Sequence, residues 1–502
     1  MNVLIIAGHP RRDSFSHALA DAFEAGAREA GVAVERIDLT DGRFDPNVTM
    51  PSPARQHFED DIVRGQALIR WADHIVFVYP TWWGTMPALL KGFLDRTLTP
   101  GFAFADREEG GWDKLLEGRT AQIVTTMDTP RWVYRWIYGA PGHRAMARAT
   151  LGFCGIGPVR VASYGPIKDS TATERSAWLA DARALGRALE RGVLTRAERL
   201  GRQVSPWLKA IRFQFYPMTL IAYTIGAFAA TEGGRPFDTA AYWLGFLCLF
   251  LIEAATVFTN DRYDFDSDRN NRNYGPFNGG SRVIVDGLLS FGQLRAGAGL
   301  ALIVAAVAGV LALAASPGSG IVIVALLLAT TVIGIGYTAP PLKLSHRALG
   351  EIDVGVTHSF AVILLGFVLQ GGHWSEGAPW GLALPLFLSV LPAITLSGLP
   401  DYEADAAAGK TTLAVALGRE GALRLSMALV LAAALAGLIF NLTWPAAFAG
   451  IAWIVLPHAA LLTWRLGQYY RRGAPGGRID GLMVNGLTYI LWFGLVPLIN
   501  LW

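Results

Sequence analysis

The chain has 502 residues, of which 52% are hydrophobic and 17% are charged, and its formal net charge is +3. This length predicts two or three domains, and the small net charge argues against a nucleic-acid partner. The two cysteines, Cys154 and Cys248, lie in different halves of the chain, which excludes a disulfide framework or a cysteine-based metal site and indicates a reducing cytoplasmic environment.

Five short apolar runs alternate with helical patterns in the first part of the chain. They cover residues 2–7, 32–38, 74–80, 121–126 and 159–164. Strands that alternate with helices predict an α/β fold with a doubly wound parallel sheet, which binds ligands at the carboxyl ends of its strands. Because residues 1–8 contain no basic residue and no cleavage site, we expect a first strand there and not a signal peptide.

Two loops at this edge of the predicted sheet suggest ligand binding. The turn at residues 8–14 leads into the N-terminus of a hydroxyl-rich helix, which suits a phosphate, although an ordinary capped helix would look the same. The loop after the third run carries adjacent Trp82 and Trp83 between Pro80 and Gly84. This pattern predicts either a flat aromatic partner or a subunit interface.

The motif His9-Pro-Arg-Arg-Asp-Ser14-Phe15-Ser16, the stretch 80–96 and Phe153-Cys154-Gly155 resemble the flavodoxin-like NAD(P)H:quinone oxidoreductase family over residues 1–190. The resemblance implies a flavin, FMN or FAD, hydride transfer from NAD(P)H to a quinone, and a homodimer with the flavin at its interface. A departure is Met127-Asp128, where the family often has Gly-Gly. The implied flavin contacts are His9, Ser14, Phe15, Ser16, Pro80, Thr81, Trp82, Trp83, Thr125 and Thr126.

Tyr138 and His143 are candidates for the polar pair that donates protons to the quinone in some members of this family. The alternative is a surface tyrosine and a histidine that caps a helix.

A basic linker at residues 191–212 follows this domain. It is helical by pattern, and Trp207 lies among its cations. This composition predicts an interfacial amphipathic segment that holds the first domain in the cytoplasm. The cations of its later part are Arg196, Arg199, Arg202, Lys209 and Arg212.

Residues 213–502 form a third region, in which charges nearly disappear over long runs. The pattern predicts an all-α integral membrane domain of nine spans in the inner, or cytoplasmic, membrane. With the linker in the cytoplasm, basic residues gather in the loops after even-numbered spans, which places the C-terminus outside. The predicted spans are 213–231, 239–259, 292–315, 320–338, 352–371, 378–398, 423–441, 445–464 and 480–501.

Three of the cytoplasmic loops contain residues suited to chemistry, at 260–268, 337–351 and 399–413. On a helix Asp261, Asp264 and Asp268 would share one face, as would Asp401 and Asp405. Carboxylates at the end of an apolar helix are costly and usually functional. Two facing acidic clusters beside basic residues suit two Mg²⁺ ions and a diphosphate, because Mg²⁺ prefers oxygen ligands and bridges to phosphates.

The pattern Asn-Asp-x-x-Asp-x-x-x-Asp, the stretch Tyr-Thr-Ala-Pro-Pro-Leu-Lys, and Asp-x-x-x-Asp followed by Gly-Lys-x-Thr-Leu resemble the UbiA superfamily of membrane prenyltransferases over about residues 205–502. The resemblance implies that the five aspartates bind Mg²⁺ and that a prenyl diphosphate ionises beside them. Lys343 and Lys410 would assist, with Arg347 or in its place Arg272 and Arg282, while Asn260 and Tyr337 are candidates on the acceptor side. Merely solvated acidic loops are the alternative.

Two enzyme-like regions on one chain suggest a coupled reaction. A hydroquinone is electron-rich and can be alkylated, whereas a quinone cannot, so the leading hypothesis is that the first domain reduces a quinone, such as a naphthoquinone, and the membrane domain prenylates it in a menaquinone-like biosynthesis. One alternative is reduction of the prenylated product. Another is a flavin redox sensor, because the first domain also resembles regulatory subunits of glutathione-gated potassium efflux systems.

Overall fold

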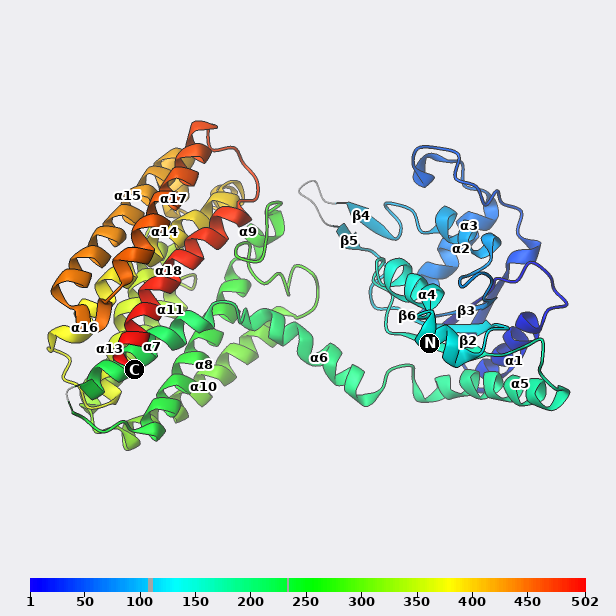
Figure 1. Ribbon diagram of the computed structural model, residues 1–502, viewed down its shortest axis with the longest axis horizontal. Coiled ribbons are helices and arrows are strands. Elements are labelled where there is room, and N and C mark those ends of the chain that lie inside the picture. Colours follow the sequence, from blue (N-terminus) through cyan, green and yellow to red (C-terminus); the bar gives the residue numbers. More distant parts are fainter. Residues whose placement is uncertain (107–111, 233) are drawn as a thin grey trace. The chain divides into compact units, whose positions relative to one another are not determined.

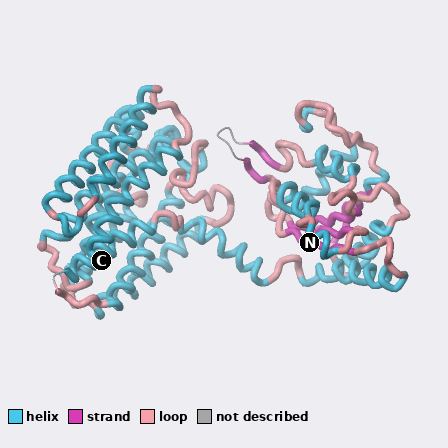
Figure 2. Tube along the Cα trace, viewed as in Figure 1, coloured by secondary structure: helices cyan, strands magenta, loops and turns pink. Residues whose placement is uncertain are grey.

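A computed structural model describes residues 1–106, 112–232 and 234–502 of the chain. It divides into two compact units, Met1–Leu200 and Gly201–Trp502, and strands occur in the first of them (Figures 1 and 2).

The first unit is built on a five-stranded parallel sheet in the order β2-β1-β3-β6-β7. This confirms the α/β fold class predicted from the alternating apolar runs. The strands are β1 (Asn2–Ala7), β2 (Ala33–Asp38), β3 (His74–Pro80), β6 (Thr120–Thr126) and β7 (Val159–Tyr164).

Helices cover both faces of this sheet (Figure 1). Because side chains alternate along a strand, Val3 and Ile5 pack toward α1 (Phe15–Glu29) and α5 (Ala172–Arg187). Leu4 and Ile6 instead join the core on the other face, under the helices α2 (Asp60–Trp71) and α3 (Ala88–Thr97). A short helix α4 (Pro141–Arg144) lies between two π-helical turns, Val133–Ile137 and Ala145–Leu151.

A short antiparallel pair, β4 (Phe104–Asp106) and β5 (Trp112–Lys114), lies outside the main sheet and was not predicted. Each strand has three residues, two of which in β5 are charged. So short and polar a segment carries no periodic apolar signal, and its pairing is a tertiary feature.

The second unit is almost entirely helical, and its long helices run alongside one another (Figures 1 and 2). A π-helical turn, Thr357–Ala361, joins the helices α12 (Gly350–Val356) and α13 (Val362–Leu369). The helices are α7 (Tyr216–Glu232), α8 (Thr239–Tyr263), α9 (Phe265–Asn270), α10 (Phe291–Ala315), α11 (Gly320–Gly336), α12 (Gly350–Val356), α13 (Val362–Leu369), α14 (Gly377–Ala407), α15 (Leu413–Thr443), α16 (Pro445–Phe448), α17 (Ile451–Arg471) and α18 (Asp480–Leu501).

Among the described residues, 6 helical segments are long and apolar enough to cross a membrane. They are α8, α10, the segment Gly350–Leu369, α14, α15 and α18. The three remaining runs of the predicted nine form α7, α11 and α17, of 17, 17 and 21 residues. Nine spans and the outward C-terminus therefore stay predictions, whereas the α-helical membrane domain agrees with the sequence.

Small residues let helices of this unit approach closely. A Cβ on Gly226 of α7 would lie 1.9 Å from the carbonyl oxygen of Ile363, and one on Gly366 of α13 would lie 2.2 Å from that of Tyr223. Close backbone contact through glycine is the usual way in which helices pack within a bilayer, where no hydrophobic force distinguishes a neighbouring helix from lipid.

The predicted linker contributes α6 (Arg196–Ile211). Its exposed apolar residues Leu200, Val204 and Leu208 recur every fourth position and form a stripe along one face. Near its end Trp207 packs on Phe258 and Lys209 Nζ lies 2.7 Å from Asp286 Oδ2. The apolar stripe suits the interfacial position predicted for this segment.

Candidate functional site

The first candidate site lies at the carboxyl ends of β1, β3 and β6, where parallel strands place their following loops at one edge. Ser14 caps α1 by accepting a hydrogen bond from the His17 backbone N–H at 3.3 Å. Ser16 Oγ lies 3.3 Å from Thr126 Oγ1, and Thr81 Oγ1 lies 2.7 Å from Thr125 Oγ1. The structure therefore brings together hydroxyl groups that the sequence analysis assigned from three separate segments of the chain.

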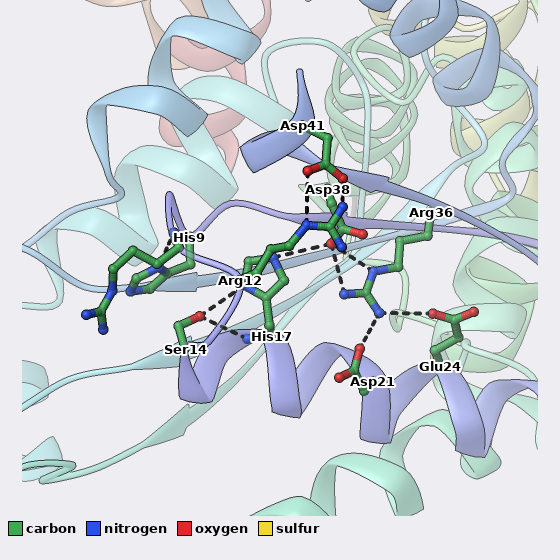
Figure 3. Close-up of polar contacts among 10 residues, drawn as sticks. His9, Arg12, Ser14, His17, Asp21, Glu24, Arg36, Asp38 and Asp41 are labelled. Carbon is green, nitrogen blue, oxygen red and sulfur yellow. Dashed lines mark hydrogen bonds and ion pairs between the residues drawn. The ribbon is translucent and has the colours of Figure 1, made fainter. Parts of the chain in front are cut away.

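An ion-pair network holds the turn before α1 (Figure 3). Arg12 pairs with Asp41, and Arg36 Nη2 lies 2.8 Å from Asp38 Oδ1. His17, buried between the turn and the sheet, connects the two parts: its Nδ1 lies 3.0 Å from Ser14 Oγ and its Nε2 lies 3.4 Å from Asp38 Oδ1. The sequence analysis missed His17, whose only signal was its place one turn into the capped helix.

An aromatic surface adjoins these hydroxyl groups. The buried His9 ring meets the Trp82 ring edge-on with 5.4 Å between their centroids, and burial lowers the pKa of His9. Trp83 is fully exposed at 103% of its reference area, in a left-handed backbone conformation with a φ of 51°. Exposed tryptophans at a ligand-binding edge suit either a flat ligand or a second subunit, the two alternatives of the sequence analysis. Phe15 packs away from them, on Trp178 at 6.1 Å.

A tyrosine and a histidine do pair near this edge, but the tyrosine is Tyr134 and not Tyr138. The rings of Tyr134 and His143 meet edge-on at 4.8 Å, and the Tyr134 hydroxyl donates to the Gly84 carbonyl oxygen at 2.8 Å. Burial lowers the pKa of His143 to about 4, so its imidazole is neutral at physiological pH. Tyr138 is 59% exposed, and its role at the quinone stays a prediction. Sequence spacing missed Tyr134 because a π-helical turn, and not a regular helix, sets which residues face inward.

The second candidate site begins where α8 ends. The sequence analysis expected the first three aspartates on one continuous helix, but the helix breaks at Asp264, between α8 and α9. Asp261, Asp264 and Asp268 are all buried, and Asp261 accepts hydrogen bonds from the Ser281 backbone N–H at 3.0 Å and from the Ser281 hydroxyl.

The two acidic stretches, far apart in sequence, contact each other. Asp405, near the end of α14, accepts a hydrogen bond from the Ser267 hydroxyl at 2.6 Å. Asp401, one turn earlier, accepts from the side-chain amides of Asn271 and Asn278, each at 2.7 Å, and from the Gly279 backbone N–H at 3.1 Å. The facing clusters predicted from the two spacings therefore exist in the fold.

Lys410 lies buried between the clusters. Its Nζ is 2.8 Å from Asp264 Oδ2 and 3.3 Å from Asp405 Oδ1. Burial works against the charged ammonium, but the two carboxylates favour it more strongly and raise the pKa of Lys410 above its usual range. Among the described residues, Lys410 is thus the cation that contacts both acidic stretches.

The loop at residues 278–282 presses against Asp268. A Cβ on Gly280, which has a φ of +67°, would lie 1.9 Å from Asp268 Oδ2, so the loop needs glycine there. Arg282 donates to the Asp268 backbone carbonyl at 2.6 Å and stacks on the Tyr274 ring at 3.9 Å. Burial, reinforced by the neighbouring Asp264, raises the pKa of the Asp268 carboxyl group well above its ordinary value.

The loop at residues 337–351 joins this site through its ends. Its Ala348 backbone N–H donates to the Thr411 carbonyl at 2.5 Å, and the buried Glu351 accepts a hydrogen bond from the Leu413 N–H at 2.8 Å. The sequence analysis missed Glu351, although an acidic residue directly before an apolar run was a signal. Lys343 and Arg347, like Arg272, are exposed, while Tyr337 and Asn260 are partly buried.

The donor chemistry of this site suits Mg²⁺. It offers carboxylate oxygens, and Asp264 Oδ1 is buried with no hydrogen-bond partner among the described residues. Within the same residues, however, no three His, Cys, Asp or Glu side chains lie close enough to hold an ion by themselves. Because Mg²⁺ usually takes one or two carboxylates together with water and substrate phosphate, this arrangement fits an ion that arrives with a diphosphate.

Known proteins are similar to both units. Residues 1–185 match the flavodoxin-like fold family, and residues 219–477, more than half of the chain, match the UbiA prenyltransferase family. The chain is 33% identical over 173 residues to an uncharacterized NAD(P)H oxidoreductase of Haemophilus influenzae, which covers 33% of this chain and 85% of that protein.

It is also 33% identical over 139 residues to an FMN-dependent NADH:quinone oxidoreductase of Ruegeria pomeroyi, which covers 24% of this chain and 67% of that protein. A solved structure of digeranylgeranylglyceryl phosphate synthase aligns over 60% of this chain and 97% of its own, with a TM-score of 0.41 and 16% identity.

Proposed function

Starting from a chain that belongs to the UbiA prenyltransferase family and carries a flavodoxin-like NAD(P)H oxidoreductase domain, we propose that this integral membrane enzyme reduces a quinone and then prenylates the hydroquinone. The observation that carries the proposal is the contact between the acidic stretches of α8–α9 and α14 around Lys410, on the same polypeptide as the reductase domain.

The membrane unit would bind a prenyl diphosphate at this contact. Lys410 supplies a positive charge to the departing diphosphate, and Gly280 leaves room for the Asp268 carboxylate. Mg²⁺, held by Asp261, Asp264, Asp268, Asp401 and Asp405, would supply Lewis-acid stabilisation of the leaving group. The exposed Lys343, Arg347 and Arg272 would attract the incoming anion from solvent, while Arg282 holds the loop against Asp268.

The first unit would hold a flavin at the carboxyl edge of its sheet. The N-terminus of α1 offers backbone N–H groups and the hydroxyl groups of Ser14 and Ser16 to a phosphate. Trp82 and Trp83 offer a flat apolar surface. The flavin, FMN by similarity to the Ruegeria protein, would supply hydride transfer from NAD(P)H. Neutral His143, whose Nε2 has no hydrogen-bond partner among the described residues, would orient a quinone oxygen by hydrogen bonding, and Tyr134, bonded to Gly84, would hold the His143 ring in place.

Reduction must precede prenylation because the acceptor needs electron density. The quinone takes a hydride and a proton and becomes a hydroquinone, while NAD(P)H becomes NAD(P)⁺. A ring carbon of the hydroquinone then forms a bond to the allylic carbon as its bond to diphosphate oxygen breaks, and one proton is released. The reductase product is thus a suitable nucleophile for the membrane unit.

The proposal includes the setting of the enzyme. We place domain boundaries at residues 1–190, 191–212 and 213–502, with nine spans, a cytoplasmic reductase and the C-terminus outside. The acceptor would be a naphthoquinone in a menaquinone-like pathway, and the enzyme a homodimer. The basic linker and the excess of basic residues on one side support this orientation.

The test uses the full-length protein in lipid nanodiscs with a panel of quinones and prenyl diphosphates, and products are identified by mass spectrometry. We expect a prenylated product to form from oxidised quinone only when NAD(P)H is added. A chemically reduced acceptor supplied without oxygen should be prenylated without NAD(P)H. Prenylation of oxidised quinone under air at the same rate without NAD(P)H would refute the coupling.

A further inference from the structure

A second polar cluster lies inside the membrane unit, away from the aspartates. Glu253 on α8 and His358 in the π-helical turn face each other, with 3.9 Å between Glu253 Oε1 and His358 Nε2. The Thr219 hydroxyl of α7 donates to Glu253 Oε2 at 2.8 Å. An ionisable side chain at mid-bilayer costs about 2.5–3.5 kcal/mol on insertion scales, so such residues are retained for a function.

The imidazole has a defined orientation. His358 Nδ1 lies 3.1 Å from the Val354 carbonyl oxygen, which can only accept a hydrogen bond, so Nδ1 carries a proton. Nε2 then points to the carboxylate. With a second proton on Nε2 the ring is an imidazolium cation, and in this state the pair is a hydrogen-bond donor facing an acceptor of opposite charge.

No direct hydrogen bond joins the two side chains of the pair. At 3.9 Å the two atoms are too far apart for a direct hydrogen bond, and neither side chain is sealed, with 16% of Glu253 and 28% of His358 exposed. A hydroxyl group placed between them would donate to Glu253 and accept from His358. Buried Tyr216 and Asp353 lie nearby, and each has an oxygen that makes no hydrogen bond among the described residues. These oxygens could also bind a polar group.

The pair is aligned with the diphosphate site along α8. Glu253 and Asn260 of α8 are separated by seven residues, which places them on one face of a helix with 3.6 residues per turn, and Asp264 follows directly after the end of α8. At about 1.5 Å per residue, Glu253 lies about 10 Å below Asn260 along the helix axis. The interval between Asp264 and Glu253 is long enough for an aromatic ring between the diphosphate and the pair.

Building on the proposed prenyl transfer, we infer that Glu253 and His358 bind a hydroxyl group of the aromatic acceptor and that Glu253 removes its proton. As the O–H proton moves to Glu253, the oxygen pushes electron density into the ring. The neighbouring ring carbon forms the new bond to the allylic carbon, whose bonding pair to oxygen leaves with diphosphate. The resulting dienone regains aromaticity when the proton on that ring carbon moves to the oxygen, and the proton on Glu253 passes to solvent.

The test compares Glu253→Gln with Glu420→Gln, which changes an exposed glutamate of the same unit. Glutamine keeps the shape and the bond from Thr219 but is not a base. We expect kcat for prenylation to fall by about 100-fold in Glu253→Gln, as general-base loss typically costs 10²–10⁴-fold. KM for the prenyl diphosphate and the rate of NAD(P)H oxidation should be unchanged. Glu253→Asp should recover part of the rate, and His358→Gln should raise KM for the acceptor.

A series of chemically reduced acceptors separates chemistry from structure. Acceptors with more acidic hydroxyl groups need less help from a base, so the defect of Glu253→Gln should shrink along the series. A defect of equal size for every acceptor, or wild-type rates in Glu253→Gln, would overturn the inference. Wild-type protein that prenylates none of the acceptors would instead refute the proposed function itself.

Discussion

Replacing Lys410 by methionine is a direct test of the acidic contact in the membrane unit. Methionine has nearly the shape of lysine but no charge, so the substitution leaves Asp264 and Asp405 buried without the ammonium that now lies 2.8 Å and 3.3 Å from them. We expect the membrane unit to lose stability in the absence of divalent cations and to recover part of it when Mg²⁺ is added.

The size of the effect follows from the two distances. With an effective dielectric constant of about 20, charges at 2.8 Å and 3.3 Å attract by about 6 and about 5 kcal/mol. Burial of the ions costs several kcal/mol each and cancels much of this attraction. Removing one partner of a buried pair typically costs about 3–5 kcal/mol, which corresponds to a fall of about 10 °C in the unfolding midpoint.

The assay follows Cys248, which is buried in the membrane unit, with a thiol-reactive dye during heating. A Cys154→Ser background confines the signal to this unit, and Lys343→Met, which changes an exposed lysine, is the matched control. Measurements with a chelator and with Mg²⁺ give the cation dependence. A midpoint for Lys410→Met equal to that of Lys343→Met in chelator would refute the reasoning.

Four further outcomes are expected. Asp264→Ala should abolish prenyl transfer and leave NAD(P)H oxidation intact, measured on the same preparation. Gly280→Ala should raise KM for the prenyl diphosphate, because the added Cβ meets Asp268 Oδ2 at 1.9 Å and a left-handed non-glycine residue costs about 1–2 kcal/mol. Tyr134→Phe should lower quinone reduction without affecting prenylation of a chemically reduced acceptor, since it removes the hydroxyl group bonded to Gly84. Burial lowers the pKa of His74 to about 4, so between pH 6.5 and about 4 the unfolded chain binds a proton that the folded first unit does not, and the free energy of unfolding falls as the pH falls. His74→Asn should reduce this loss of stability.

Each of these has an outcome that contradicts it. Parallel loss of both activities in Asp264→Ala would show that the units cannot be treated separately. An unchanged KM in Gly280→Ala, or equal rates of quinone reduction in Tyr134→Phe and wild type, would remove the assigned roles. Circular dichroism measures the stability of both proteins as the pH falls. An equal loss of stability in wild type and His74→Asn would contradict the histidine prediction.

The redox-sensor alternative has its own signature. A sensor would make prenylation depend on the flavin state even when chemically reduced acceptor is supplied. Ser16→Ala, which removes the hydroxyl group near Thr126 at the phosphate-binding edge, is a suitable probe. An enzyme that only prepares the acceptor should prenylate this reduced acceptor normally.

The sequence by itself determined those parts of the protein that depend on local patterns. The strands at residues 2–7 and 74–80 could be predicted because parallel strands that are buried on both faces form continuous apolar runs. The acidic stretches were readable because carboxylates beside apolar helices are rare, and both units were identified from short motifs. The nine apolar runs are helical in the structure, two of them in more than one segment, and nine membrane spans remain a prediction.

Only the tertiary structure decided which side chains meet. Lys410 was one of several candidate cations, and its burial between Asp264 and Asp405 follows from the packing of α9 against the end of α14. Tyr134 faces His143, and Glu253 faces His358, because π-helical turns shift side chains from the positions of a regular helix. These pairings join different elements through packing, whereas a periodic pattern carries information about one element at a time.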